Sequence, residues 1–504
     1  MIKPNRIVAT DLCHSHPGQR AHRTDAFYVQ LANQLLNDFW KAHIDLGENT
    51  AVILRYTAVS LASYMEDVVA DSGQWRMFST LCQKMFGWPV PMYHDADEEY
   101  YPDEPSMMAV RYLIWNAATE MDDIWWKPEI QEFDCMAQIA FKRLDSMFEN
   151  APVNSQLVDD INELLHTATE DFLTMRPALI WVSLNSYITR SENAEKLLMK
   201  MIDETASLSD AMNESMRFHA SIMNLIFQYR VGPLALYAKD WLAELMRTRK
   251  MTEAAADMEA IERIPAGAYK YTVSADGKTL YMEHTNGRRL QLAREEITLT
   301  DSQLRQYDAC TATFVSYQGA WHMNGAMMPF KHDETHWKQI CEKASDYIPK
   351  GLTIADAKWY LERTGGKQML FFAGKKEAED YLKNNMMYVE GATDFLASSG
   401  YAGQPIMMFI DENDTQGFLQ FTFGFTPCIA APDNPFYDED IARQEAVEML
   451  WNDDSIGTGA MLYMLDHCYL PEILTDDQLC QNSTYQERES DVRFLLRYMR
   501  REKY

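Results

Sequence analysis

The spacing of apolar residues changes character near Pro265, and this change predicts the layout of the chain. Before it, apolar residues recur at helical intervals; Phe27, Leu31, Leu35 and Phe39, for example, line one face of a helix that begins near Thr24. Further helical patterns cover 54–68, 106–126, 129–149, 155–175, 178–190, 192–230 and 233–260. We therefore expect an N-terminal all-α bundle over residues 24–262.

The second of these helices carries two carboxylates away from its apolar stripe. The stripe consists of Leu54, Ala58, Leu61, Met65 and Val68, with the spacing of one helix face. The carboxylates, Glu66 and Asp67, fall off that face, so the pattern predicts that both are solvated.

Two tight-turn signals follow the helical region. Asp276-Gly277 and Asn286-Gly287 each lie between short alternating runs, which is typical of antiparallel hairpins. The strands 311–317 and 320–323, joined at Gln318-Gly319, extend this three-stranded meander. Five short strands predict a small SH3-like β-barrel over residues 263–331.

The last part of the chain mixes both patterns. Predicted strands cover 368–372, 406–410 and 418–423, and predicted helices cover 333–346, 353–363, 375–384, 438–452, 458–468 and 490–502. We therefore expect a C-terminal α+β domain over 332–504, and residues 1–23, which are polar and His-rich, as an N-terminal arm. The fold class is multidomain α+β.

Composition and charge exclude several functions. With 504 residues and 47% hydrophobic residues, the chain has enough apolar material for two or three cores, which excludes extensive disorder. A net charge of −29 disfavours generic nucleic-acid binding. The basic cluster at Arg493, Arg497 and Arg500 suits a helix C-terminus better than a phosphate-binding patch.

We expect a cytoplasmic protein. No stretch of eighteen apolar residues appears, which predicts no membrane span, and the first residues have no apolar signal region. The eight cysteines contain no CxxC pair and are expected to be reduced and mostly buried.

Two histidine-containing segments suggest a metal, but neither has a complete ligand set. His332 and His336 are one helical turn apart, with no third ligand that the sequence can place, and a solvated helix start explains them as well. Cys13-His14-Ser-His16, with His22 nearby, has donors for zinc or copper, but we favour a flexible histidine arm without that function. We predict no cofactor.

Other motifs fail on spacing. Glu163-Leu-Leu-His166 lacks the second copy that di-iron bundles need, and the acidic loop after His94 lacks the glycine and glutamate of a calcium hand. Thr364–Lys367 lacks a phosphate-loop glycine. Glu66 and Asp67, with Glu120, Asp122 and Asp123, form a carboxylate site only if their helices pack together; a solvated face is the favoured alternative.

Several segments together resemble an uncharacterised bacterial family catalogued only as a domain of unknown function. They are Thr24-Asp-Ala-Phe-Tyr28, Leu61-Ala-Ser-Tyr64-Met-Glu66-Asp67-Val, Gly73-Gln-Trp75 with Phe78, Arg111-Tyr-Leu-Ile-Trp115 and Ala431-Pro-Asp-Asn434-Pro435-Phe436-Tyr437. The resemblance spans residues 20–500, approximately. It implies a cytosolic bacterial protein and supplies no activity, cofactor or catalytic residue.

The sequence leaves the function open between two hypotheses. The first is a non-enzymatic protein-interaction or scaffold protein whose partner is another protein, with no nucleic acid and no membrane. The second is a metal-dependent enzyme of hydrolase type that uses helix carboxylates or the pair His332 and His336. The candidate binding residues are Glu66, Asp67, Trp75, Asp122, Asp123, Asn434 and Tyr437.

Overall fold

A computed structural model shows the chain as two compact units, residues 1–337 and 338–504. It describes residues 4–94, 99–122, 124–208, 213–285, 287–297, 299–335, 337, 357–386, 403–413, 419–471, 485–501 and 504. The described residues form helices and antiparallel sheets, with 55% of them in helices and 14% in strands. This confirms a mixed α+β class, whereas the division into four segments stays a prediction.

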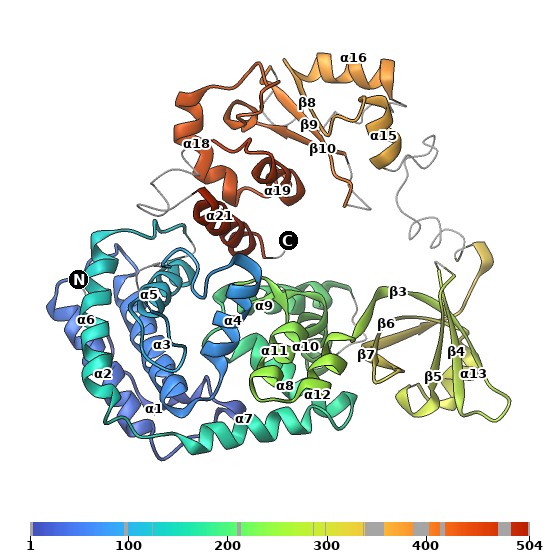
Figure 1. The fold of residues 1–504 in the computed structure, drawn as a ribbon. Helices are drawn as coiled ribbons and strands as arrows, with labels where there is room; N and C mark the ends of the chain where they lie inside the picture. The colour runs from blue at the N-terminus through green and yellow to red at the C-terminus, as the bar shows by residue number, and fades with distance from the viewer. Residues whose placement is uncertain are drawn as a thin grey trace. The chain divides into compact units, whose positions relative to one another are not determined.

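The first unit begins with helices (Figure 1). Their bounds are α1 (Ala9–Cys13), η1 (Pro17–Gln19), α2 (Asp25–Lys41), α3 (Thr50–Ala70), α4 (Gln74–Phe86), α5 (Met107–Asp122), α6 (Gln131–Phe148), α7 (Ser155–Thr167), α8 (Phe172–Leu184), α9 (Glu192–Leu208), α10 (Glu214–Gln228), α11 (Ala238–Thr248) and α12 (Thr252–Glu259). The short strands β1 (Arg230–Val231) and β2 (Leu236–Tyr237) form a small hairpin before α11. The helices predicted for this region are present, whereas the all-α domain over 24–262, within which this hairpin lies, stays a prediction.

Helix α3 is buried on nearly all sides because it contacts α1, α2, α4, α5, α6 and α7 (Figure 1). The predicted stripe is buried, and Leu54, Leu61 and Met65 are fully inaccessible. The prediction that Glu66 and Asp67 are solvated is wrong, since they are 1% and 2% exposed. Neighbouring helices cover the polar side of α3 as well as the apolar side.

The first residues pack into the helical region. Helix α1 contacts α2 and α3, and Leu12 and Cys13 at its end are buried. His16 and His22, expected in a flexible arm, are 1% and 8% exposed. This part of the segment is buried although it is polar, because its side chains have hydrogen-bond partners on distant helices.

A five-stranded antiparallel sheet follows. Its strands are β3 (Glu262–Val273), β4 (Thr279–His284), β5 (Arg289–Ala293), β6 (Ala309–Tyr317) and β7 (Ala320–Phe330), with η2 (Arg294–Glu296) and α13 (Asp301–Gln306) between β5 and β6. The order is β5-β4-β3-β6-β7, which confirms the predicted meander and the two added strands. At the last hairpin Gln318 and Gly319 both have positive φ, 47° and 78°, as a tight two-residue turn requires.

This sheet curls into a half-barrel around its own core. Tyr269, Leu280, Met282 and Phe314 are almost completely buried there. The sheet also bonds to the helical region, where the Tyr317 hydroxyl donates to the Ala168 carbonyl at 3.0 Å. The β module therefore belongs to the same compact unit as the helices.

The second unit contains a three-stranded antiparallel sheet of order β10-β9-β8 and several helices. The elements are α15 (Ala357–Arg363), β8 (Met369–Phe372), α16 (Lys375–Asn385), β9 (Ile406–Ile410), β10 (Leu419–Phe423), η3 (Thr426–Cys428), α18 (Glu439–Trp451), α19 (Thr458–Asp466) and α21 (Tyr485–Met499). They match the predicted strands and most predicted helices; residues 338–346 of the first predicted helix lie outside the described residues.

Two further sequence predictions bear on the described residues. The six described cysteines are free thiols, and Cys13, Cys82, Cys310 and Cys428 are buried. Among the helices described, none combines the length and the hydropathy that a membrane crossing needs.

Candidate functional site

A buried polar cluster lies where the start of the chain meets α3. Cys13 is the last residue of α1, His16 precedes η1, Asp25 is the first residue of α2, and Glu66 lies near the end of α3. These four side chains are 6%, 1%, 4% and 1% exposed. Short turns between α1, η1 and α2 bring the first three together, and the packing of α1 on α3 adds the fourth.

Asp25 is only partly satisfied within this cluster. Its Oδ2 accepts a hydrogen bond from Cys13 Sγ at 3.1 Å and one from the His22 backbone amide at 2.7 Å. Its Oδ1 is buried and has no hydrogen-bond partner among the residues that the structure describes. Burial, followed by the hydrogen bond and charge of Asp25, raises the pKa of Cys13 to about 12, so the thiol is protonated at neutral pH.

His16 contacts an oxygen atom at each ring nitrogen. Nδ1 lies 3.0 Å from the Arg20 carbonyl and Nε2 lies 2.9 Å from Glu66 Oε2. Burial lowers the pKa of His16, but the hydrogen bond and the charge of Glu66 outweigh it, and the net pKa is raised. The cluster therefore contains a buried pair of an imidazole and a carboxylate.

Asn154 links this pair to a second histidine. Its amide nitrogen donates to Glu66 Oε1 at 2.7 Å and to His22 Nδ1 at 3.0 Å, while its oxygen caps the start of α7. His22 Nε2 in turn lies 3.0 Å from Asp160 Oδ2 on α7, and the His16 and His22 rings stack with centroids 4.3 Å apart. The network thus joins segments as far apart as residues 13 and 160.

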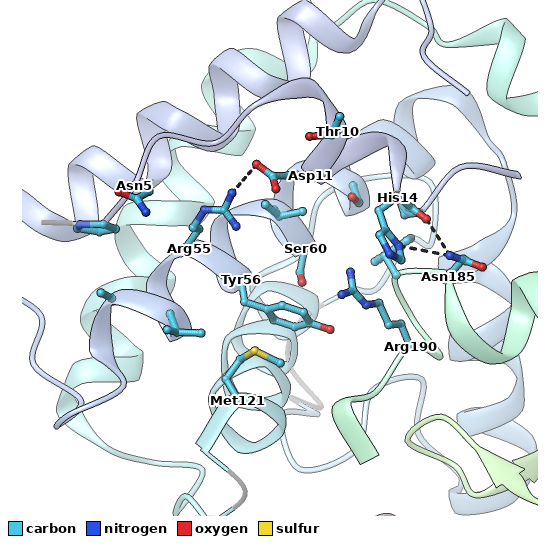
Figure 2. Close-up of a pocket in the computed structure, with 17 residues that line it drawn as sticks. Asn5, Thr10, Asp11, His14, Arg55, Tyr56, Ser60, Met121, Asn185 and Arg190 are labelled. Carbon is cyan, nitrogen blue, oxygen red and sulfur yellow. Dashed lines mark hydrogen bonds and ion pairs between the residues drawn. The ribbon is translucent and has the colours of Figure 1, made fainter. Parts of the chain in front are cut away.

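A pocket of about 520 Å³ opens beside this cluster (Figure 2). His14 and Ser15, which lie between Cys13 and His16, form part of its wall. The other lining residues come from the start of the chain, α3, the end of α5 and the segment after α8: Pro4, Asn5, Thr10, Asp11, Ala51, Val52, Arg55, Tyr56, Val59, Ser60, Ser63, Met121, Asn185, Tyr187 and Arg190.

The pocket is lined by one carboxylate, one imidazole and two guanidinium groups. Arg55 pairs with Asp11 at 2.5 Å, and Arg190 lies over the Tyr56 ring at 5.9 Å (Figure 2). Arg190 also bonds to Glu195 at 3.3 Å. Burial and the charge of Arg190 lower the pKa of His14, so its imidazole is neutral at pH 7. The local charge is therefore not strongly negative, in contrast to the chain as a whole.

Two buried atoms in the pocket wall have unused hydrogen-bonding capacity. Ser63 Oγ and Arg55 Nε are inaccessible and bond to nothing among the described residues. Buried polar groups without partners are uncommon in proteins, and they mark positions where a ligand or water completes the bonding.

A second pocket of about 530 Å³ is lined in part by the stretch from Pro17 to Arg20. Asp160, Glu163 and Asn185 are among its lining residues, and Arg20 pairs with Asp160 at 3.5 Å. Because Asp160 also holds His22, the polar network extends from the cluster to this second pocket.

Of the predicted site residues, Asp67 and Trp75 lie together. The Trp75 backbone amide donates to Asp67 Oδ2 at 2.6 Å, and the Trp75 ring is packed against Tyr64 and Phe78 in the core. Both residues hold the start of α4 against α3. Glu66 is directed elsewhere, to His16 and Asn154.

Asp122 lies apart from this cluster, and Asn434 and Tyr437 belong to the second unit. Asp122 accepts a hydrogen bond at 2.6 Å from Asn49, the residue just before α3 begins. Glu66 lies seventeen residues after Asn49, which corresponds to about 25 Å along the helix at a rise of 1.5 Å per residue. Asn434 is buried in the second unit, where it bonds to the Thr426 and Ile429 carbonyls.

Tyr437 is 39% exposed in the same unit. Asp123 and His336 lie outside the described residues, so their predicted roles stay predictions. His332 lies near Glu334, with a separation of 3.5 Å between Nε2 and the carboxylate.

Sequence reasoning missed Arg55, Arg190 and Asn154 as site residues. Arg55 is eleven residues before Glu66, three helical turns away on the same helix, but a single arginine carries no signal of its own. Asn154 was identifiable only as a turn residue before a helix. Its second function, bonding Glu66 and His22, depends on contacts 88 and 132 residues away.

Comparison with known proteins gives a family but no activity. A family model described as "Protein of unknown function (DUF3843)" matches residues 6–287, which is more than half of the chain. The match contains the helical region and the first strands of the sheet. No curated protein and no solved structure matches the chain.

Proposed function

The chain belongs to this family of unknown function, and from the geometry of the first unit we propose that it binds a small organic molecule through a carboxylate or phosphate group. The observation that carries the proposal is the pocket of about 520 Å³, which is lined by Arg190, His14 and the buried Ser63. Pockets for small molecules in proteins typically have volumes of about 300–1,000 Å³.

Arg190 supplies the positive charge for the anionic group. Arg55 already pairs with Asp11, whereas among the described residues Arg190 pairs with one carboxylate, that of the half-exposed Glu195. A guanidinium presents several N–H donors in a planar fork that matches carboxylate and phosphate oxygens. On a chain of net charge −29, a concave site with an available guanidinium is where an anion is attracted rather than repelled.

Neutral donors complete the site. His14 Nδ1 accepts from the Asn185 amide at 3.3 Å, so the neutral ring carries its proton on Nε2. Ser63 Oγ can donate or accept and has no partner among the described residues. Val52, Val59 and Met121 add apolar surface, which favours an organic ligand over a bare inorganic ion.

This pocket weakens the hypothesis of a non-enzymatic protein-interaction or scaffold protein. A scaffold protein does not need a cavity lined by several ionisable groups. A protein partner, the SH3-like character of the sheet, and a cytoplasmic and bacterial setting stay predictions. The metal-dependent enzyme based on helix carboxylates or on His332 and His336 also stays a prediction.

The proposal is tested by ligand binding to the full chain. A panel of monocarboxylates, dicarboxylates, sugar phosphates and inorganic phosphate is screened by thermal shift, and the strongest binders are titrated by calorimetry. Because a hydrogen bond to a charged group contributes about 1.5–3 kcal/mol, Arg190→Gln is expected to weaken binding by roughly tenfold or more. Arg305→Gln, an exposed arginine in α13, is the matched control and is expected to change nothing.

Ser63→Ala separates ligand contact from folding. Since the hydroxyl has no partner among the described residues, its removal is expected to leave stability unchanged or slightly increased while binding weakens several-fold. Binding by no member of the panel, or equal binding by the wild type and Arg190→Gln, would refute the proposed function.

A further inference from the structure

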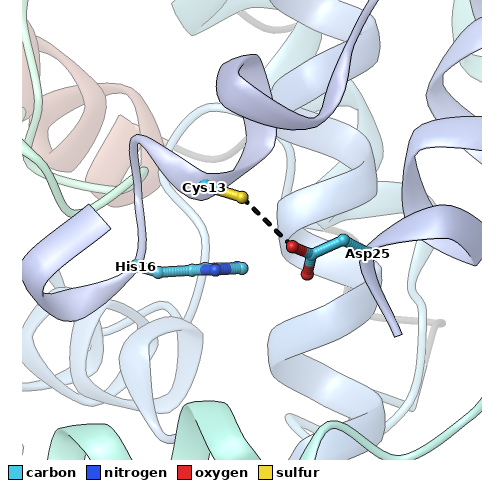
Figure 3. Close-up of side chains that lie close together, drawn as sticks. All are labelled: Cys13, His16 and Asp25. Carbon is cyan, nitrogen blue, oxygen red and sulfur yellow. Dashed lines mark hydrogen bonds between the residues drawn. The ribbon is translucent and has the colours of Figure 1, made fainter. Parts of the chain in front are cut away.

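We infer that Cys13, His16 and Asp25 form a binding site for a divalent transition-metal ion, with Glu66 next to it. One donor atom from each of the first three residues lies within 4.8 Å of the others, and all three residues are buried (Figure 3). Figure 3 shows His16 and Asp25 directed toward each other, with the Cys13 thiol beside the carboxylate. The inference is independent of the proposed ligand pocket, because none of these residues is among those that line it.

The spacing of the donor atoms suits direct coordination. Cys13 Sγ and Asp25 Oδ2 are 3.1 Å apart, and His16 Nε2 and Glu66 Oε2 are 2.9 Å apart. A tetrahedral zinc ion with bonds of 2.0–2.3 Å separates its ligand atoms by about 3.3–3.6 Å. The donor atoms of Cys13, His16 and Asp25 lie within 4.8 Å of one another, so side-chain shifts of about an ångström bring them to bonding distance around one ion.

The bare carboxylate oxygen is a second, independent indication of a ligand. Asp25 Oδ1 is buried in a side chain that is 4% exposed, and it accepts no hydrogen bond from any residue that the structure describes. A carboxylate oxygen in that state is costly, whereas coordination to a cation satisfies it. Its other oxygen is already held by Cys13 and by the His22 amide, so the carboxylate is fixed in position.

His16 is oriented in the way that metal-binding histidines usually are. The Arg20 carbonyl, 3.0 Å from Nδ1, fixes the ring and leaves Nε2 toward the carboxylates. Glu66, the neighbour of Nε2, is itself fixed by Asn154 at 2.7 Å. On coordination the ion displaces the proton on His16 Nε2 and the proton on the Cys13 thiol. Glu66 is then positioned either as a fourth ligand or as an outer hydrogen-bond partner.

The donor set selects the metal and its function. A thiolate sulfur, an imidazole nitrogen and a carboxylate oxygen suit zinc and disfavour magnesium and calcium, which prefer oxygen alone. Burial of every ligand and their absence from the pocket walls assign a structural role: the ion fixes the segment from Cys13 to Asp25 against α3.

The test is the metal content of untagged full-length protein, measured by elemental analysis after incubation with Zn²⁺ and desalting. The wild type is expected to retain one zinc per chain, as are the controls Cys135→Ala and His166→Ala, which alter a partly buried thiol and an exposed imidazole elsewhere. Cys13→Ser and His16→Ala are expected to lose the ion. A wild type without zinc, or a Cys13→Ser protein that keeps a full equivalent, would overturn the assignment.

A spectroscopic measurement covers the case in which a variant folds poorly. The wild type loaded with Co²⁺ is expected to show the near-ultraviolet charge-transfer absorption of a thiolate–cobalt bond. Cys13→Ser preserves size and the hydrogen bond to Asp25, so it is expected to fold and to lack this absorption. Absence of the band in cobalt-loaded wild type also contradicts the site, whatever the variants do.

Discussion

The carboxylate of Asp67 is predicted to hold the start of α4, and its replacement tests this directly. Asp67 accepts hydrogen bonds from the backbone amides of residues 73–75 at 2.6–3.2 Å and from the hydroxyls of Ser72 and Tyr187 at 2.5 and 2.8 Å. Burial raises the pKa of Asp67, although these hydrogen bonds oppose the shift.

Asp67→Asn keeps the shape and removes the charge. In the variant, the amide nitrogen of Asn replaces the oxygen that accepts the hydrogen bond from the Trp75 N–H. The buried Trp75 N–H then has no acceptor, which costs about 1–3 kcal/mol of stability. The other hydrogen bonds weaken because their acceptor is neutral, and the smaller desolvation cost of an amide offsets part of this loss. We expect local destabilisation of about 3 kcal/mol, or roughly a hundredfold in the opening equilibrium of α4.

Hydrogen exchange of the full chain, followed by mass spectrometry, measures this opening. Peptides that contain residues 73–78 are expected to exchange roughly a hundredfold faster in Asp67→Asn than in the wild type. Asp71→Asn is the matched control, because Asp71 pairs with Arg76 at 3.0 Å with a carboxylate that is 65% exposed. Exposed pairs contribute about 0–1 kcal/mol, so little change is expected there. Unchanged exchange in Asp67→Asn would refute the reasoning.

Three further substitutions have expected outcomes in thermal or denaturant unfolding. Arg500→Met is expected to destabilise the second unit by about 3–5 kcal/mol, because Arg500 is 1% exposed and donates to three carbonyls at 2.6–2.7 Å, two of them in the last turn of α18. Asn154→Ala is expected to cost the first unit about 2–4 kcal/mol, since it removes a helix cap and the bonds to Glu66 and His22. Gly232→Ala is expected to cost about 2–4 kcal/mol, because φ is +70° and a Cβ meets the Trp241 ring at 3.0 Å.

The substitutions at Arg500 and Gly232 each have a matched control. Arg443→Met removes an exposed partner of Glu439 and is expected to change stability by less than about 1 kcal/mol. Gly277 has a similar positive φ of 73°, but a Cβ added there meets no atom within 4 Å. Gly277→Ala is therefore expected to cost only the backbone strain of about 1 kcal/mol. Equal effects for Gly232→Ala and Gly277→Ala would contradict the steric argument.

The sheet and most helices were predictable because their signals are local. Strand alternation at Leu280 and Met282, and turn residues at Gly277 and Gly319, specify hairpins without reference to the rest of the chain. The apolar stripe of α3 is equally local. These features need no knowledge of which elements pack together.

Burial of the polar residues was not predictable in the same way. A stripe of apolar residues shows which face of α3 is certainly covered, but it cannot show that other helices also cover Glu66 and Asp67. Both are buried because partners from distant segments satisfy them, among them His16 and Tyr187. The pairing of residues 50 and 120 positions apart is set by tertiary packing.

The candidate sites combine residues that the sequence shows only separately. Cys13, His16 and Glu66 were each visible as chemical groups, but no spacing rule connects the start of the chain with the end of α3. Arg55 and Arg190 carried no signal at all, since isolated arginines occur on most surfaces. Their significance arises from the pocket that both of them line.

The most direct test of the central claim, that the pocket binds a small anion through Arg190, is native mass spectrometry of two proteins. Wild type and Arg190→Gln are equilibrated with the same pooled panel of carboxylates and phosphates. We predict one organic adduct per wild-type chain and a strongly reduced adduct on Arg190→Gln at the same concentration. Equal adducts on both proteins, or none on the wild type, would contradict the account.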